Sequence, residues 1–239
     1  MKLETLINQI RGGLIVSCQA LDDEPLHGAN VMPRMAVAAA EGGAVGIRAN
    51  GANDIREIKK EVNLPVVGIV KRTYEGSPIY ITPTMREVEE VALAGAEVVS
   101  LDATFRPRPN GIELSDLLEQ IHRTFPELLV MADISTLEEG IGAADLGFDL
   151  VASTMSGYTP YTEHDPNPNF DLIEQLVQSV DIPVIAEGHI RTPEDAARCI
   201  ELGCTSVVVG SAITRPQEIT KHFVERLKMV RPTAKPSAR

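Results

Sequence analysis

The stretch Gly95-Ala96-Glu97-Val98-Val99-Ser100-Leu101-Asp102-Ala103 contains the structural unit that recurs along the chain. A glycine ends one segment, a short run rich in aliphatic residues follows, and an acidic side chain stands near the end of that run. Small-residue stops before such runs recur at Gly43, Gly95, Gly147 and Gly203, with spacings of 52, 52 and 56 residues. This spacing predicts a weak repeat of two strand–helix units.

The apolar runs predict strands that are covered on both faces, because most of them show no alternation with polar residues. Segments with helical periodicity lie between them. The expected strands are Gly13–Gln19, Val45–Ala49, Val66–Lys71, Val98–Ala103, Leu128–Ser135, Leu150–Thr154, Val184–Glu187 and Thr205–Gly210. The expected helices include Arg34–Glu41, Asp54–Glu61, Arg86–Leu93, Leu114–Thr124, Leu172–Val180 and Pro193–Leu202.

Alternating strands and helices over 239 residues predict one closed α/β barrel of the (β/α)8, or TIM, class. An open doubly wound sheet would carry a glycine-rich fingerprint after its first strand, and none follows Val16. We expect residues 1–228 to form a single catalytic domain with a short N-terminal helix within Met1–Arg11. Residues 229–239 are expected to be a disordered tail.

The composition limits the classes of partner. A net charge of −12 argues against nucleic acid but not against a small anion held by a few arginines. No apolar run is long enough to cross a bilayer, so we expect a cytoplasmic protein without a membrane partner. The three cysteines, Cys18, Cys199 and Cys204, match no zinc spacing and are expected to be buried thiols.

Polar residues end nearly every predicted strand, at the barrel face where such folds place their active sites. Lys71 and Glu187 are the hardest to explain structurally, because each ends an otherwise apolar run. Asp102 and Asp133 have a structural alternative, which is an ion pair with Arg48 or Lys71. The full set is Gln19, Arg48, Lys71, Asp102, Asp133, the segment Ser153–Ser156, Glu187 and Gly210-Ser211.

The loops after the seventh and eighth strands predict a phosphate site. Gly188 and Gly210 allow close backbone approach, and Ser211–Thr214 can form a helical turn with N–H groups directed at an anion. Arg215 would add a forked donor; the alternative is a plain glycine-rich turn with Arg215 as a surface charge. His27, His164 and His189 fall in loops facing the same mouth, and His189 is a candidate ligand contact. No two histidines have a metal-ligand spacing, so we expect no metal.

Several long segments resemble the N-acylglucosamine-6-phosphate 2-epimerases, also called N-acetylmannosamine-6-phosphate 2-epimerases. The resemblance runs from about Gly12 to Leu227 and covers every predicted barrel unit. The matching segments are Ile15-Val16-Ser17-Cys18-Gln19-Ala20, Gly43-Ala44-Val45-Gly46-Ile47-Arg48, Ile79-Tyr80-Ile81-Thr82-Pro83-Thr84, Ala132-Asp133-Ile134-Ser135-Thr136, Ser156-Gly157-Tyr158-Thr159-Pro160-Tyr161 and Gly210-Ser211-Ala212-Ile213-Thr214-Arg215-Pro216.

This resemblance implies a cofactor-free epimerase of amino-sugar and sialic-acid catabolism, built on a barrel of the ribulose-phosphate-binding type and expected to be a homodimer. Lys71 and Glu187 match the family's catalytic pair. The implied substrate-binding residues are Gln19, Arg48, Asp133, Ser156 and Tyr158, and the phosphate-binding residues are Gly188, Gly210, Ser211 and Arg215. Ser211 departs from the family pattern, which has glycine there, and the tail after Leu227 is longer than in the family.

Inverting C2 of an N-acyl-hexosamine 6-phosphate requires ring opening, which makes the C2 proton acidic, followed by removal and return of that proton. Three alternatives remain open from the residues. They are an aldolase or lyase that forms a Schiff base at Lys71, a metal-dependent sugar-phosphate epimerase, and a catalytically silent phosphosugar-binding regulator.

Overall fold

The computed structural model describes residues 1–28, 30–162 and 167–230. Its described residues contain eight parallel strands that pair in chain order and close into a barrel, with β8 beside β1. The strands are β1 (Leu14–Cys18), β2 (Gly46–Asn50), β3 (Val66–Ile69), β4 (Val98–Asp102), β5 (Leu129–Asp133), β6 (Leu150–Ala152), β7 (Val184–Glu187) and β8 (Ser206–Val209). The predicted TIM barrel is therefore confirmed.

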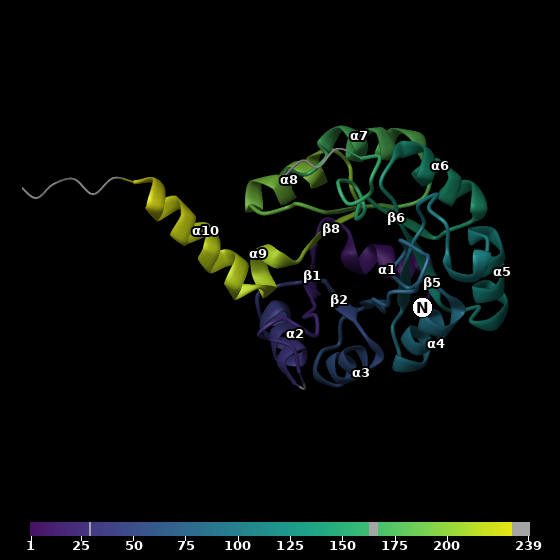
Figure 1. Ribbon diagram of the computed structural model, residues 1–239, viewed down its shortest axis with the longest axis horizontal. Coiled ribbons are helices and arrows are strands. Elements are labelled where there is room, and N and C mark those ends of the chain that lie inside the picture. Colours follow the sequence, from purple (N-terminus) through teal and green to yellow (C-terminus); the bar gives the residue numbers. More distant parts are fainter. Residues whose placement is uncertain (29, 163–166, 231–239) are drawn as a thin grey trace, which may run out of the picture.

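The helices form a ring around the barrel, and α1 lies across one of its ends (Figure 1). Helix ends agree with the sequence-based expectations to within about three residues at most positions. The elements are α1 (Leu3–Ile10), α2 (Val31–Glu41), α3 (Ala52–Glu61), α4 (Met85–Ala94), η1 (Pro109–Gly111), α5 (Leu114–Thr124), α6 (Leu137–Leu146), α7 (Phe170–Ser179), α8 (Pro193–Glu201), α9 (Ser211–Thr214) and α10 (Pro216–Met229).

Two apolar layers hold this arrangement together, one on each face of the sheet. The inner layer fills the barrel with side chains such as Ile15, Val98 and Met131. Leu6 and Ile10 of α1 join this layer and close the end of the barrel at which the strands begin. The outer layer packs the opposite faces of the strands against the surrounding helices. Because both faces of the strands are buried in this way, the strands are mostly apolar, and the acidic side chains of β4, β5 and β7 stand at the last strand residue.

The predicted two-unit repeat has a physical basis at the helix ends. Gly43, Gly95, Gly147 and Gly203 all have φ between 93° and 102°, a left-handed conformation that other residues adopt at a cost. The even-numbered helices α4, α6 and α8 begin with capping boxes of Thr84 with Glu87, Thr136 with Glu139, and Thr192 with Asp195. The same local signals therefore start and stop equivalent helices.

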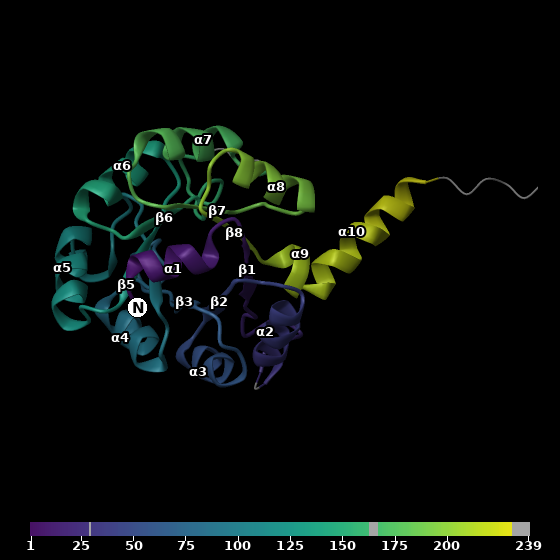
Figure 2. The ribbon, with the colours of Figure 1, turned by 180° about the vertical axis from the view of Figure 1, so that it is seen from behind.

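The C-terminal helix departs from the ring. In Figures 1 and 2, α10 extends away from the barrel instead of lying against it, and it has no buried residue. It continues to Met229, where we expected the tail to begin, and residues 231–239 lie outside the described part.

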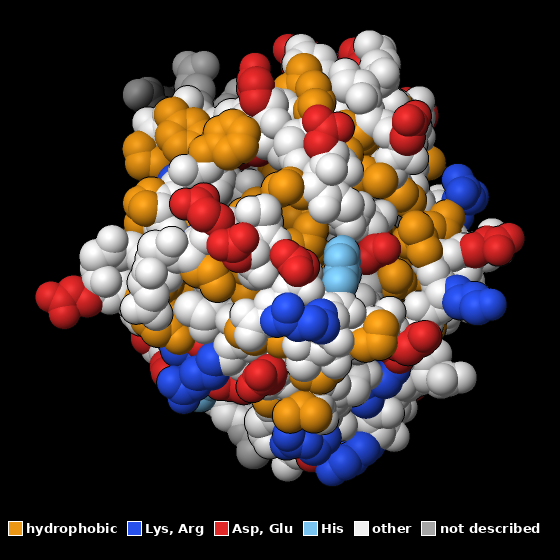
Figure 3. Space-filling model, turned by 90° about the vertical axis from the view of Figure 1, so that its right-hand side faces the viewer, with side chains coloured by type: hydrophobic (Ala, Val, Ile, Leu, Met, Phe, Trp, Pro, Cys, Tyr) orange, Lys and Arg blue, Asp and Glu red, His pale blue; other side chains and the backbone are white. Residues whose placement is uncertain are grey.

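No described helix is long and apolar enough to cross a membrane. On the face that carries α5, acidic and basic side chains are interspersed (Figure 3).

The close packing of β3 against its helices predicts a strong effect of one added methyl group. A Cβ at Gly68 would lie 2.5 Å from Val91 Cγ1 and 2.9 Å from Ile55 Cδ1. We expect Gly68→Ala to lower the free energy of unfolding by about 1–3 kcal/mol, measured by chemical denaturation. The control is Gly142→Ala, whose Cβ would come no closer than 3.9 Å to another atom. Equal stability of the two variants would contradict this packing.

Candidate active site

A cavity of about 270 Å³ opens at the carboxyl ends of the strands, where the sequence placed the site. It is lined by residues that lie far apart in the sequence and that the barrel brings to one mouth. Most of the predicted site residues are among them, namely Gln19, Arg48, Lys71, Tyr158, Glu187, Gly188, Gly210, Ser211 and Arg215. Asp133 and Ser156 do not line this cavity.

Arg48, on β2, is the central charge of the site. Arg48 is only 1% exposed, and its guanidinium has two carboxylate partners. Nη1 and Nη2 donate to the Asp133 carboxylate over 3.1 and 2.5 Å, and Nη1 also donates to Glu187 Oε2 over 2.5 Å. A buried charge is tolerated only with such partners. The ion pair that the sequence offered as an alternative for Asp133 is therefore formed, with Asp133 lying behind Arg48.

Glu187 ends β7, and its side chain is 14% exposed. Burial raises the pKa of its carboxyl to about 7; Arg48 opposes this shift, and the neighbouring Asp133 carboxylate adds to it. Thr154 also contacts this carboxyl, at 3.2 Å from Oε2. Near neutral pH the group is consequently populated in both its protonated and ionised forms.

Lys71 lies two residues beyond β3, because the strand ends at Ile69, earlier than predicted. There the backbone of Lys71 forms an antiparallel bridge with Ile81. The Lys71 backbone N–H donates to Asn50 Oδ1 over 2.8 Å. The pKa of the Lys71 ammonium is lowered to about 8, chiefly by burial and also by the positive charges of Arg48 and Arg215. This agrees with the expectation that an apolar mouth beside Arg48 would favour a neutral amine.

The predicted phosphate loop has the expected local structure. Ser211–Thr214 forms the short helix α9, and Thr214 Oγ1 anchors it by donating to the Ser17 carbonyl over 2.8 Å. Arg215 donates through Nη1 to Ser211 Oγ over 2.9 Å and also pairs with Glu24, at 2.5 and 2.9 Å. Glu24 is a residue that the sequence did not single out, and its pKa is lowered by Arg215.

An aromatic pair forms another wall of the cavity. The rings of Tyr158 and His189 are stacked with centroids 4.7 Å apart and an interplanar angle of 9°. His189 adopts a φ of 57°, which is uncommon for a residue other than glycine. It does face the mouth as predicted. Ser156 lies beside this wall, where its hydroxyl accepts a hydrogen bond from Asn169. His164 lies outside the described residues.

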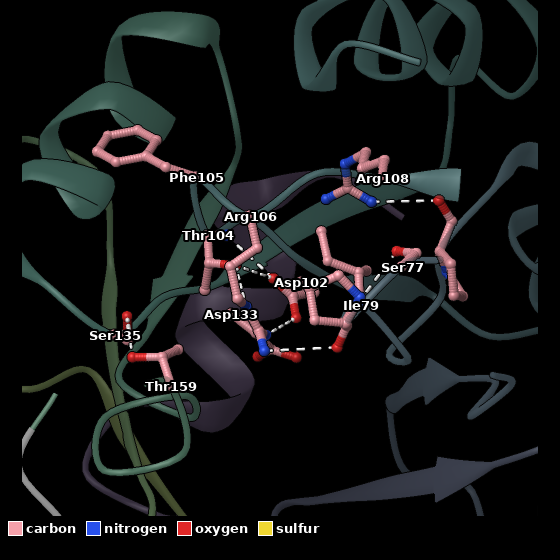
Figure 4. Close-up of polar contacts among 12 residues, drawn as sticks. Ser77, Ile79, Asp102, Thr104, Phe105, Arg106, Arg108, Asp133, Ser135 and Thr159 are labelled. Carbon is pink, nitrogen blue, oxygen red and sulfur yellow. Dashed lines mark hydrogen bonds and ion pairs between the residues drawn. The ribbon is translucent and has the colours of Figure 1, made fainter. Parts of the chain in front are cut away.

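Asp102 has a different partner from the two that the sequence suggested. Its carboxylate pairs with Arg106 over 2.5 Å and accepts hydrogen bonds from the Thr104 backbone and hydroxyl (Figure 4). The interpretation that Asp102 pairs with Arg48 or Lys71 is thus wrong, because Arg106 follows four residues later and reaches back over the strand end. Asp102 is nevertheless the direct neighbour of Asp133 across β4 and β5.

Within residues 1–28, 30–162 and 167–230, no three His, Cys, Asp or Glu side chains gather into a group able to hold a metal ion. Cys18, Cys199 and Cys204 are free, buried thiols, as expected.

Sequence comparison identifies the family. The model of a family described as "putative N-acetylmannosamine-6-phosphate epimerase" matches residues 32–229. A Clostridium perfringens protein described as a "putative N-acetylmannosamine-6-phosphate 2-epimerase" is 56% identical over 93% of this chain and 100% of its own length. The chain belongs to this family. A member from Borrelia garinii subsp. bavariensis is 49% identical over 95% of this chain and 99% of its own.

Solved structures agree with this family membership. The N-acetylmannosamine-6-phosphate 2-epimerase from Clostridium perfringens superposes with a TM-score of 0.89 and 55% identity, covering 92% of this chain and 95% of that one. Thiamine phosphate pyrophosphorylase from Pyrococcus furiosus superposes with a TM-score of 0.60 at 19% identity, covering 93% and 96% of the two chains. The latter similarity shows the barrel fold alone.

The two adjacent buried aspartates give a test of the electrostatics in this family member. We expect Asp133→Asn to lower the pKa of Glu187, because it removes a negative charge that favours the neutral carboxyl and leaves Arg48 to Glu187 alone. The pKa is measured by carbon-13 NMR of labelled glutamate side chains. Asp102→Asn is the matched control, since Asp102 is equally buried but paired with Arg106. A Glu187 pKa that falls in neither variant, or equally in both, would refute this network.

Proposed function

We propose that this protein inverts C2 of N-acyl-hexosamine 6-phosphates and so interconverts N-acetylmannosamine 6-phosphate and N-acetylglucosamine 6-phosphate. The observation that carries the proposal is the pair of Lys71 and Glu187 in one cavity. An amine with a lowered pKa and a carboxyl with a raised pKa face the same space from β3 and β7, which lie on opposite sides of the barrel. The family membership supports the same activity.

The chemistry follows from these two protonation equilibria. Opening the sugar ring places an aldehyde at C1, and the C2 proton then lies next to a carbonyl. One group of the pair removes this proton on one face of the sugar, and the other returns a proton on the opposite face. With pKa values of about 8 and about 7, both Lys71 and Glu187 exist in acid and base forms near neutral pH. Either direction of reaction is therefore served by the same pair.

The other predicted residues take their proposed roles from their positions around the pair. Arg48 would stabilise negative charge that develops on the enolate oxygen, while Asp133 would bind substrate only through Arg48 or after a rearrangement, because it is buried behind it. Gln19 and Tyr158 line the cavity and are proposed to contact the sugar directly. Ser156 is proposed to act from the edge of the site.

We propose that the phosphate binds at the mouth of β7 and β8, against Gly188, Gly210, Ser211 and Arg215. Gly188 lines the cavity with a φ of 107°, a left-handed conformation that favours glycine. Arg215 offers a forked donor at this mouth, and Glu24 occupies it in this structure. A phosphate would therefore have to exchange with the Glu24 carboxylate as the partner of Arg215.

The rival activities differ in what they leave on Lys71. An aldolase would form a Schiff base with its amine, and borohydride would then trap a covalent substrate adduct. A regulator would bind the phosphosugar without turnover.

We also propose a cytoplasmic location, which three unpaired thiols favour because such thiols persist in reducing compartments.

The role of Lys71 predicts the outcome of one substitution. Lys71→Met keeps the length and the apolar stem, so the barrel should fold and be at least as stable thermally. Epimerisation should fall by at least about 10²-fold, because a positioned acid–base group is lost. In D2O the unmutated enzyme should place deuterium at C2 of the product, and NMR measures this incorporation. Lys60→Met, on the exposed side of α3, is the control. A folded Lys71→Met variant with near-full activity would remove Lys71 from the reaction.

The phosphate assignment predicts a separation of binding from turnover. Arg215→Ala should raise KM by about 10- to 100-fold, the cost of a lost charged hydrogen bond, and should change kcat far less. The reason is that the phosphate keeps its charge throughout the reaction, so its contacts act on ground and transition states alike. Arg56→Ala, an exposed arginine on α3, is the control. Equal reactivity of the unphosphorylated sugar would contradict the assignment.

We further propose that the protein is a homodimer in which the copies exchange α10. The helix has exposed Phe223 and Leu227 on one stripe, 69% and 70% accessible. An apolar groove of about 420 Å³ lies over β8 and α8, where the eighth helix of such a barrel would normally pack. It is lined by side chains including Ala196, Ile200 and Ile213. The groove and the stripe are complementary in character, and α10 of the same chain points away.

The dimer proposal is tested by the mass of the protein in solution, measured by light scattering after gel filtration. We expect a dimer, and we expect Leu227→Glu to shift it toward monomer, because a buried carboxylate without a partner is costly. Glu225→Gln, on the opposite side of α10, should leave the dimer intact. An unmutated protein that is monomeric at micromolar concentration, with α10 folded onto its own groove, would overturn the exchange.

A further inference from the structure

Thr154 follows β6, and its side chain contacts both carboxylates of the site. Its Oγ1 is 2.7 Å from Asp133 Oδ1 and 3.2 Å from Glu187 Oε2. The adjacent Ser153 behaves differently, because its hydroxyl contacts only the backbone of Glu187. It donates to the carbonyl over 2.8 Å and accepts the N–H over 3.1 Å. One of these two hydroxyls is thus placed to respond to the charge of the Glu187 carboxyl.

A hydroxyl has one proton to donate and lone pairs to accept with. Donation from Thr154 to Glu187 would favour the ionised carboxyl and lower its pKa. When Asp133 and Glu187 are both ionised, however, the one Thr154 proton can go to only one of them, and the shorter distance favours Asp133. The 3.2 Å contact becomes a second hydrogen bond only if Glu187 carries a proton and donates it to Thr154 Oγ1. Protonated Glu187 therefore has one more hydrogen bond through Thr154 than ionised Glu187 has.

The other charged groups that face Glu187 do not supply this contact. Arg48 reaches it from β2 and favours the ionised carboxylate, as Lys71 does from beyond β3. Asp133 faces it from β5 and favours the neutral carboxyl through its charge. Thr154 is the neutral group between the two acids, and it links them into the chain Glu187, Thr154, Asp133.

We propose that Thr154 is a positioning residue that acts through Glu187 and stabilises its protonated form during the reaction. In epimerisation Glu187 must hold a proton in one half of the cycle and lack it in the other. In one direction Glu187 takes the C2 proton, holds it against Thr154 Oγ1 and releases it to solvent after turnover. In the other direction it takes a proton from solvent and delivers it to C2, so Thr154 itself neither gains nor loses a proton. The inference rests on the proposed function for the role of Glu187, but the contact with Glu187 can be measured without turnover.

The test is a titration of the full-length protein labelled with carbon-13 in the glutamate carboxyls, with Glu187→Gln used to assign the Glu187 signal. Thr154→Val removes the hydroxyl and keeps the shape of the side chain. We expect its Glu187 ionisation constant to rise by about three- to tenfold, the value of one hydrogen bond. Thr154→Ser should titrate like the unmutated protein. Ser153→Ala should also leave the titration unchanged, since its hydroxyl contacts only backbone.

The same variants are then compared in the pH dependence of kcat/KM, where the limb that belongs to Glu187 should move by the same factor in Thr154→Val alone. An unchanged Glu187 titration in Thr154→Val, or an equal shift in Thr154→Ser, would overturn the proposal. If the valine variant does not fold, Thr154→Ala provides the same comparison. An unmutated protein that titrates as expected but does not epimerise would refute the proposed function and leave the Thr154–Glu187 contact in place.

Discussion

Arg48 carries a positive charge that has almost no access to water, and the geometry of the site depends on how that charge is satisfied. Its guanidinium lies between Asp133 and Glu187 and brings two carboxylates together that would otherwise repel each other. The same charge acts on Lys71, whose ammonium becomes easier to deprotonate. One buried cation therefore acts on both groups of the proposed acid–base pair: it favours the neutral amine of Lys71 and limits the rise in pKa that burial gives Glu187.

This arrangement requires a rigid frame, because a small movement of β2 or β7 would leave a charge buried without a partner. The barrel provides that frame through its two apolar layers and through helix ends that are fixed by repeated local signals. Glu139 shows how far these signals extend, since its buried carboxylate caps α6 and also accepts hydrogen bonds from the Phe105 backbone and the Tyr161 hydroxyl. The caps thus connect neighbouring loops at the mouth of the site.

Much of the fold was predictable because its signals are local. The apolar runs and the glycine stops before the even-numbered strands depend on residues a few positions apart, and the structure confirms both. The strand ends were less predictable: β3 stops before Lys71 because the chain turns to pair with Ile81. The candidate site residues were found by one rule, that strand ends of a barrel face a common mouth.

The barrel, the family and the polar residues at the mouth can all be read from the order of the amino acids. The folded chain set which of these residues pair: Asp133 with Arg48 rather than Lys71, Asp102 with Arg106, and Arg215 with Glu24. It also decided that Thr154 lies between two acids and that α10 leaves the barrel. The physical reason is that secondary structure follows from short-range patterns, whereas ion pairs and protonation states depend on distances and burial between residues far apart in the chain.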